Sequence, residues 1–398
     1  MILSIQNYNK MLLIQLYPFT YLDSSNNNLL LYNTLNNKFK FIKNNVSIHV
    51  ENRTSLILDE NTINSNIASE IAQEQYGYIH FTQSLSNKKI MDYYSVLTKY
   101  YNDYTTQEWD NKFIVENYID KIVLNISESI DLFTGSIQRP TTFHQIINKH
   151  TINEVGSHIS NFKKLTKLSI NTDYKALIVC INEINKLAKK CYNIELNIPF
   201  SDFQLQQENI LKLFNGKINL IINNLNHNVK DDLFYHINRN NNVYFKVVIS
   251  SLFDINLLES WGLLNNSKLS LEIASNQKED KLQDLLCYDF SEIINSKQSV
   301  EQIIRKENIN TLYWGELFIK SNGNLMSNPI FSIGNINDWN NINFGLLLSE
   351  TSIWRSTRNR FVPCRWCVLR NICPPVSLIE LLSQKQFCKI NRQNYSFI

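Results

Sequence analysis

The middle of the chain alternates short apolar runs with longer segments of helical spacing. The apolar runs have the length and residue types of buried strands, and successive runs lie mostly about 25 residues apart. They cover residues 121–126, 165–170, 194–198, 218–222, 243–249 and 269–273, with helical segments between several of them at 174–190, 203–214, 229–238 and 253–261. This alternation predicts parallel strands joined by crossover helices, in either a partial barrel or an open doubly wound sheet.

The first part of the chain has the patterns of a smaller, mixed domain. Three segments alternate or run apolar between turns of Asp, Ser and Asn, which predicts strands at 12–21, 28–33 and 38–42. Apolar residues at helical spacing predict helices at 63–76 and 90–101. We therefore expect a small α+β domain over residues 1–110, followed by the alternating part over residues 111–305.

The last part, residues 306–398, combines a hairpin with a cysteine-rich end. A strand pattern at 313–321 runs into Ser-Asn-Gly-Asn at 321–324, which predicts a tight turn, and a second strand pattern follows at 329–333. Four of the seven cysteines then fall within 25 residues, and they are Cys364, Cys367, Cys373 and Cys388. We expect the scattered cysteines to be buried without a role, and these are Cys180, Cys191 and Cys287.

The clustered cysteines have the spacing of a metal site. A Cys-x2-Cys loop places two thiolates on one metal, and the third and fourth thiolates, five and fourteen residues further on, complete a tetrahedral or cubane arrangement. Intracellular metal sites concentrate their cysteines in this way, whereas disulfide-stapled secreted domains spread them. The spacing leaves both zinc and a 4Fe–4S cluster open. Four free or disulfide-bonded cysteines are the alternative.

Composition narrows the class of protein. Of the 398 residues, 43% are hydrophobic and 19% charged, which fits a folded chain with several cores and excludes a disordered one. No apolar run approaches the roughly 20 residues of a membrane-spanning helix. The first 17 residues lack the features of a signal peptide. We therefore expect a cytoplasmic protein without a membrane partner.

Positive charge is concentrated around the cysteines. The whole chain has a net charge of +3, yet residues 355–398 contain eight Lys or Arg residues and a single acidic residue, Glu380. These cations complement the negative charge of metal-bound thiolates, and they would also suit an acidic peptide. No aromatic-interleaved RNA motif accompanies them, so we expect no nucleic-acid partner.

Motifs of other enzyme classes are absent from the sequence. The chain has no GxSxG, Walker, HExxH or GxGxxG motif. His144, His150 and His158 lie at wide spacings on a polar stretch, which is typical of surface or capping residues. Ser377 and Glu380 have the Ser-x-x-Glu pattern of a helix capping box. We therefore predict no catalytic residue.

Residues 361–380 read FVPCRWCVLRNICPPVSLIE and resemble the C-terminal SPASM-type region of radical SAM peptide maturases. In that family the cysteines continue Cys-x2-Cys-x5-Cys-x3-Cys, and a last cysteine follows after a gap. Here the x3 position is Ser377, and no cysteine lies between residues 288 and 363, so the ligands of the family's second auxiliary cluster are missing as a set. The resemblance implies that one auxiliary 4Fe–4S cluster is held by Cys364, Cys367, Cys373 and Cys388.

The same resemblance shows what the chain lacks. Radical SAM enzymes carry Cys-x3-Cys-x2-Cys in the loop after the first barrel strand, where three thiolates hold the cluster that binds S-adenosylmethionine. The corresponding loop here, 127–140, has no cysteine. Asn171-Thr172-Asp173 stands where family members often carry a Gly-Gly-Glu type motif. The resemblance therefore implies that this chain does not bind or cleave S-adenosylmethionine.

This combination looks like the pseudo-radical-SAM proteins of GG-Bacteroidales-type peptide maturation systems. Further matches are LLLYNTLN at 29–36 and WRSTR at 354–358, whereas Asn37 replaces an expected Gly. Asn also tolerates a positive φ. The resemblance implies an α/β fold: a partial (β/α)6-type TIM-like barrel with a small N-terminal α+β domain and a C-terminal SPASM/twitch-like cysteine-rich domain.

The resemblance also implies a role in the maturation of a ribosomally synthesised peptide. We expect a non-catalytic accessory protein that binds the precursor (leader) peptide, a genuine radical SAM maturase, or both. The N-terminal domain would take the leader as an added edge strand. The alternatives are an electron-transfer partner or oxidoreductase that uses the single cluster, and a separate non-radical active site in the barrel mouth. Trp354, Arg355 and Arg358 would either shield the cluster and contact a partner, or serve ordinary packing.

Overall fold

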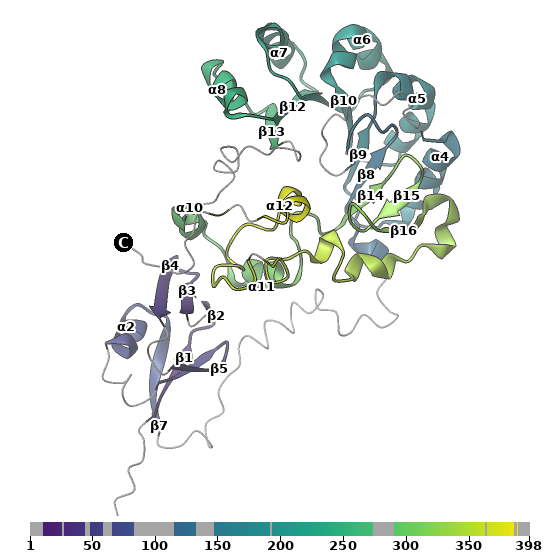
Figure 1. Cartoon of the computed structure of the whole chain (residues 1–398). Coiled ribbons are helices and arrows are strands. Elements are labelled where there is room, and N and C mark those ends of the chain that lie inside the picture. Colours follow the sequence, from purple (N-terminus) through teal and green to yellow (C-terminus); the bar gives the residue numbers. More distant parts are fainter. Residues whose placement is uncertain are drawn as a thin grey trace, which may run out of the picture.

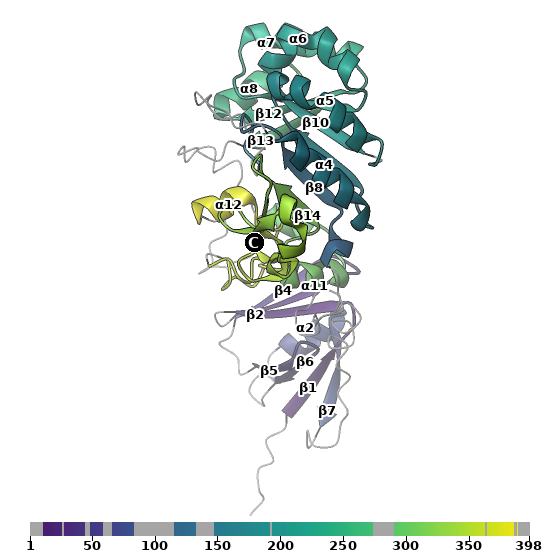
Figure 2. The same ribbon diagram turned by 90° about the vertical axis from the view of Figure 1, so that its right-hand side faces the viewer.

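The computed structural model describes residues 11–25, 28–43, 48–58, 66–82, 115–132, 147–191, 193–273, 290–362, 364–385 and 388. The helix predicted at 90–101, His144 and Cys287 lie outside these residues. Figures 1 and 2 show three parts in a row. Small N-terminal sheets form one end, the cysteine-rich segment lies in the middle, and a large sheet with its helices forms the other end.

The large sheet contains nine strands. In spatial order they are β13 (Leu269–Ile273), β12 (Val243–Ile249), β11 (Lys217–Ile222), β10 (Ile194–Pro199), β9 (Lys167–Asn171), β8 (Lys121–Asn125), β14 (Glu316–Ile319), β15 (Asn324–Met326) and β16 (Ser332–Asn335). The six strands predicted from the alternating pattern are confirmed as β8 to β13, and each pairs in parallel with its neighbour. Strands β8 to β13 follow one another in chain order, and the next strand along the chain, β14, pairs in parallel with β8 at the other side of the run. Closure into a partial barrel stays a prediction.

Helices join the successive parallel strands. They are α4 (Lys149–His158), α5 (Tyr174–Ala188), α6 (Phe200–Leu213), α7 (His227–Arg239) and α8 (Leu252–Ser260), with the short η5 (Ile159–Asn161) after α4. The helices lie along the outer side of the sheet (Figure 1), as right-handed crossovers between sequential strands require. Alternate strand residues such as Leu168, Ile170 and Leu196 are fully buried in the main apolar cluster with Leu177 and Ile184 of α5.

Strand β14 extends the sheet beyond β8 in parallel, and β15 and β16 complete it as an antiparallel hairpin. The predicted turn at 321–324 is confirmed, because it joins β14 to β15 and Gly323 adopts a φ of 85°. The large sheet therefore includes strands that the sequence pattern assigned to the last segment of the chain.

The N-terminal part contains two antiparallel sheets. One has the order β5 (Ile48–Asn52), β6 (Ser55–Leu58), β1 (Met11–Leu16) and β7 (Gly77–Thr82), and the other has β2 (Thr20–Ser25), β3 (Asn28–Asn33) and β4 (Lys38–Lys43). Helix α2 (Ile67–Gln73) lies within the predicted helical segment. The single strand predicted at 12–21 is wrong. The chain turns where Thr20 N donates to Tyr17 O (2.9 Å), so that β1 and β2 enter different sheets.

Asn37 takes the conformation for which a Gly was expected. Its φ is 58° in the turn between β3 and β4. Its side chain accepts a hydrogen bond from Tyr32 Oη (2.8 Å) and donates one to Ile294 O (2.8 Å). The second bond ties this turn to α10 (Phe290–Asn295), which is followed by α11 (Val300–Asn308).

The remaining short elements surround the cysteine-rich segment and the base of the sheet. They are η4 (Val115–Tyr118), η6 (Ile336–Asn341), η7 (Phe344–Leu348), η8 (Ile353–Arg355) and α12 (Leu378–Ser383). No helix in the described ranges combines the length and apolar character that crossing a membrane requires.

Candidate metal centre

Trp354 fixes the cysteine-bearing segment to the large sheet. Its side chain is fully buried, its Nε1 donates to the backbone oxygen of Glu316 (2.8 Å), and its ring centroid lies 5.0 Å from that of Trp314. Of the two interpretations of this residue, ordinary packing therefore fits the structure.

The four clustered cysteines lie in one region at the centre of the molecule. Cys364, Cys367 and Cys373 are buried and Cys388 is half-buried, and all carry reduced thiols. Tight turns hold the first three, because Cys367 N donates to Cys364 O and Cys373 N donates to Leu369 O, each at 2.8 Å. The thiols of Cys364, Cys367 and Cys388 all act electrostatically on that of Cys373. The segment thus gathers the predicted set.

The thiols are gathered without forming a complete coordination site in the described residues. Within the part of the chain that the structure describes, no three His, Cys, Asp or Glu side chains are arranged to hold one ion. Burial raises the pKa of Cys373 well above its ordinary value, although Arg358 opposes this. A buried thiol of this kind keeps its proton unless a metal replaces it. Four cysteine thiols in one region are the donor set that zinc or a 4Fe–4S cluster takes.

Arg358 links the cysteines to the rest of the segment. It is 5% exposed, and its Nη1 donates to Cys364 Sγ (3.2 Å) and to Glu380 Oε1 (3.0 Å), while Nη2 donates to Glu380 Oε2 (3.2 Å). Its remaining donors bond the backbone oxygens of Pro374 and Pro375. Burial disfavours its charge, but Glu380, Cys373 and Cys364 together raise its pKa above the ordinary value. Arg358 therefore supplies a fixed positive charge beside the thiols.

Glu380 has two roles, of which the sequence showed one. The capping box at the start of α12 is confirmed, because Ser377 Oγ accepts from Glu380 N and Glu380 Oε2 accepts from Ser377 N (2.9 Å). The same carboxylate pairs with Arg358, and both side chains are almost fully buried. The signal for this pair was present in the sequence, since Glu380 is the single acid in a strongly basic segment.

Helix α11 fixes the backbone on the other side of the cysteines. Lys306 Nζ donates to Gln298 Oε1 (2.8 Å) and to the carbonyls of Ile372 (3.2 Å) and Cys373 (3.1 Å). Gln298 Nε2 also bonds the Ile372 carbonyl. These contacts hold the turn that contains Cys373 against α11.

The N-terminal domain packs directly on the cysteine-bearing segment. Arg370 Nη2 pairs with Asp23 Oδ1 at 2.6 Å, and Asn371 Nδ2 donates to Tyr21 Oη at 2.9 Å. Burial raises the pKa of Asp23 to about 6, while Arg370 opposes the shift. The apolar part of this contact combines strand residues with Cys367 and Cys373 themselves, and includes Tyr21, Leu30, Tyr32, Ile303, Val368, Leu369 and Ile372.

The start of the loop after β8, residues 126–132, packs against the chain itself. Ser127 Oγ and Ser129 Oγ share a hydrogen bond of 2.6 Å, and Ser127 Oγ accepts from Asp173 N (3.2 Å). Ile130 is fully buried against Ile221 of β11 and Val248 of β12, at the carboxyl ends of the strands. Ile130 therefore packs over the carboxyl ends of β11 and β12.

The polar triplet Asn171-Thr172-Asp173 at the end of β9 has local structural partners. Asp173 caps α5 by accepting from Ala176 N (2.8 Å). Asn171 belongs to a row of amides at one register position of β8 to β11, in which each Asn donates to the Asn on the preceding strand at 2.7–2.9 Å. The row consists of Asn125, Asn171, Asn197 and Asn219.

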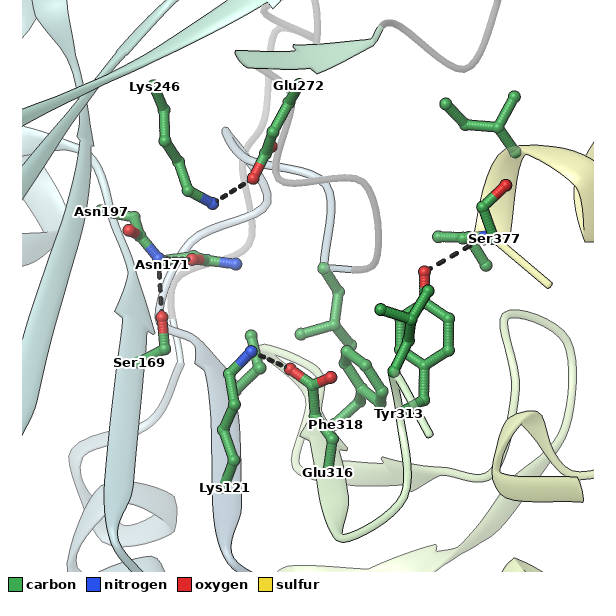
Figure 3. A pocket seen from close by; sticks show the side chains of 15 residues that line it. Lys121, Ser169, Asn171, Asn197, Lys246, Glu272, Tyr313, Glu316, Phe318 and Ser377 are labelled. Carbon is green, nitrogen blue, oxygen red and sulfur yellow. Dashed lines mark hydrogen bonds and ion pairs between the residues drawn. The ribbon is translucent and has the colours of Figure 1, made fainter. Parts of the chain in front are cut away.

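A pocket of about 340 Å³ lies between this polar sheet face and the start of α12. Figure 3 shows two ion pairs in it, Lys121 with Glu316 and Lys246 with Glu272, the latter at 2.6 Å. Tyr313 Oη faces the start of α12 and accepts from Leu378 N (3.1 Å), and burial raises its pKa to about 12. No sequence pattern indicated this pocket, because its lining comes from strands far apart in the chain.

The remaining histidines and cysteines named in the sequence analysis lie at the surface or in the packed interior. His150 is exposed beside Glu154, and the ring of His158 stacks on Trp339 with centroids 3.9 Å apart. Cys180 and Cys191 are buried, as predicted.

No protein-family model matches this chain, and no curated protein matches it. Solved structures do match, among them the crystal structure of Streptococcus suis SuiB bound to precursor peptide SuiA. That alignment covers 95% of this chain and 100% of SuiB, with 10% sequence identity and a TM-score of 0.36. A similarity of this size does not assign the chain to a family.

Proposed function

We propose that this chain is a non-catalytic, metal-binding accessory protein of ribosomal peptide maturation. It binds the precursor peptide, a genuine radical SAM maturase, or both. Cys364, Cys367, Cys373 and Cys388 would hold one 4Fe–4S cluster, or zinc in its place. The observation that carries the proposal is that the cysteine-bearing segment forms the surface on which the N-terminal domain packs.

This arrangement gives a bound metal a mechanical role. Cys367 and Cys373 contribute to the apolar contact with the N-terminal sheet, and Ser25 Oγ donates to Trp366 O (2.6 Å) from the edge of that sheet. Metal binding would fix the cysteine turns and so the position of the N-terminal domain against α11. A bound cluster would also supply electron transfer, whereas zinc would supply structure alone.

The sheet supports the non-catalytic part of the proposal. The loop after β8 has no cysteine, and Ile130 packs on Ile221 and Val248 at the carboxyl ends of β11 and β12. Asn171 at the end of β9 belongs to the amide row, and Asp173 caps α5. These contacts leave the strand ends engaged in packing, so we expect S-adenosylmethionine to remain intact in the presence of this chain and a reductant.

The N-terminal domain offers a surface for the peptide. β4 is an edge strand of the three-stranded sheet, with Lys38 and Lys43 exposed on it. A peptide that adds to a sheet edge gains backbone hydrogen bonds along its length, with side-chain charge adding selectivity. Basic residues on this strand favour an acidic leader segment.

An electron-transfer role is the second candidate. Arg365 and Trp366 lie between the first two cysteines, and both are exposed, with Trp366 at 52%. This loop therefore reaches the surface, where a redox partner would dock. The identity of the bound metal distinguishes the accessory role from the electron-transfer role, because zinc does not transfer electrons.

The first test is the metal and sulfide content, with the visible spectrum, of protein purified without oxygen. We expect about four irons and four sulfides per chain, and their loss in Cys364→Ala/Cys367→Ala. The matched control is Cys180→Ala/Cys191→Ala, which removes two buried thiols elsewhere and should retain the metal. One zinc without visible absorption would keep the accessory role and exclude electron transfer. No metal, or turnover of a precursor peptide by this chain alone, would refute the proposal.

A further inference from the structure

The connection from α6 to β11 contains one of the two Asn-Gly steps of this sequence, Asn215-Gly216. The other step is Asn322-Gly323, in the turn between β14 and β15. An Asn before a Gly is prone to lose its side-chain amide, because Gly has no Cβ to hinder attack by its own backbone nitrogen. The two steps therefore share one intrinsic chemistry, and the fold decides which of them reacts.

Hydrogen bonds hold both reacting groups of Asn322-Gly323. Gly323 N donates to Lys320 O (2.8 Å), and Asn322 Oδ1 accepts from Asn324 N (3.0 Å). The backbone oxygen of Asn322 also accepts from Asn335 Nδ2 (3.0 Å). Reaction requires the Gly nitrogen to lose its proton and the Asn side chain to turn onto it. The first two bonds must therefore break before this step reacts.

Asn215-Gly216 is not held in this way. In the part of the chain that the structure describes, no group accepts a hydrogen bond from Gly216 N, and the Asn215 side chain has no hydrogen-bond partner. Asn215 is exposed and lines a pocket of about 350 Å³ at the amino end of β11. Water therefore reaches the step, and the side chain is free to turn.

The fold also requires the glycine that makes Asn215 reactive. A Cβ at position 216 would lie 2.6 Å from Phe214 Cζ and 3.1 Å from Ile194 O. Phe214 is buried at 1% exposure, so its ring cannot move aside without loss of close packing. Packing at the end of α6 therefore keeps a Gly directly after Asn215.

We propose that Asn215 is a site of spontaneous deamidation, with Gly216 N as the nucleophile. The deprotonated nitrogen attacks Asn215 Cγ and closes a cyclic succinimide, while the bond from Cγ to Nδ2 breaks and ammonia leaves with the proton. Water then opens either carbonyl of the ring and gives an aspartyl or an isoaspartyl residue. The product carries a new carboxylate, and the isoaspartyl form lengthens the main chain directly before β11. The site does not depend on the proposed function.

The test incubates the metal-loaded full chain at mildly alkaline pH and follows both steps by mass spectrometry of tryptic peptides. Cleavage after Lys212 and Lys217 isolates Asn215 in the peptide 213–217, and fragment spectra locate Asn322 within the peptide 321–355. A sample taken at time zero corrects for reaction during digestion. The chain unfolded in urea is the reference, because it keeps the local sequences and loses the hydrogen bonds of the fold.

We expect Asn215 to react about tenfold faster than Asn322 in the folded chain, because two hydrogen bonds add to the barrier at Asn322. The two rates should be similar in urea. Asn215→Gln should remove the product from the peptide 213–217, because Gln must close a larger ring. The matched control is Asn193→Gln, which changes another amide in the lining of the same pocket and should leave the rate at Asn215 unchanged.

Three outcomes would overturn the site. The first is a rate at Asn215 in the folded chain that is no faster than the rate at Asn322. The second is the same ratio of rates in the folded and unfolded chains, because local sequence would then account for the difference without the fold. The third is undiminished product in the peptide 213–217 of Asn215→Gln.

Discussion

Replacing Glu380 by Gln tests whether the buried pair with Arg358 organises the cysteine segment. The substitution keeps the size of the side chain, and Gln also completes a capping box with Ser377. The substitution therefore removes only the negative charge of the side chain. The perturbation therefore separates the ion pair from the helix cap, which share one carboxylate.

The structure sets the size of the effect. The Arg358 Nη1 to Glu380 Oε1 distance is 3.0 Å, and the side chains are 5% and 2% exposed. At an effective dielectric of about 20 the Coulomb attraction is about 5 kcal/mol, which largely offsets the desolvation of both ions. Without the carboxylate, the desolvation of Arg358 is uncompensated, which costs about 3–5 kcal/mol in comparable pairs. Arg358 still donates hydrogen bonds to the carbonyls of Pro374 and Pro375. We therefore expect the free energy of unfolding to fall by about 3 kcal/mol.

The assay is urea unfolding of the full chain at matched metal content, followed by circular dichroism. The control is Glu208→Gln, which breaks an exposed pair with Lys212 and should change the free energy of unfolding by at most about 0.5 kcal/mol. The double variant Arg358→Met/Glu380→Gln should be more stable than Glu380→Gln, because it leaves no buried charge unpaired. A loss below about 1 kcal/mol in Glu380→Gln, or a double variant less stable than the single one, would refute the reasoning.

Two other substitutions test the domain contact and the amide row. Burial raises the pKa of Asp23 from its usual 3.8 to about 6, so the folded state holds this proton more tightly. The resulting stability is present below about pH 4 and is lost as the pH rises through about 6, with a size of about 3 kcal/mol. Asp23→Asn should remove this dependence in urea unfolding at a series of pH values, and an unchanged profile would contradict the assignment. Asn197→Ala takes hydrogen-bond partners from both Asn171 and Asn219, so it should lower the free energy of unfolding by about 2 kcal/mol, and thermal unfolding at the wild-type temperature would count against a structural role for the row.

Local sequence patterns determined much of the secondary structure. The six parallel strands, the turn at 321–324 and the capping box of Ser377 and Glu380 were all predicted, because alternation, turn residues and capping pairs act within a few residues. The same local logic accounts for Asn37, whose side chain type tolerates a positive φ. It failed at 12–21, where a largely apolar segment contains the turn between two sheets.

Tertiary structure decided the strand order and the partners of the polar residues. A strand pattern carries no information on its neighbour, so the sequential order of β8 to β13 and the addition of β14 to β16 beside β8 required the folded chain. The amide row depends on matching registers across β8 to β11, which the sequence of one strand does not contain.

The candidate site divides in the same way. The sequence by itself determined the four cysteines and the basic character of their segment, since spacing and composition are properties of the chain. The fold alone decided that Arg358 faces Cys364 and Glu380 and that Arg370 meets Asp23. The physical reason is that each buried charge requires a partner or a stabilising environment, and those groups come together through contacts between residues distant in the sequence.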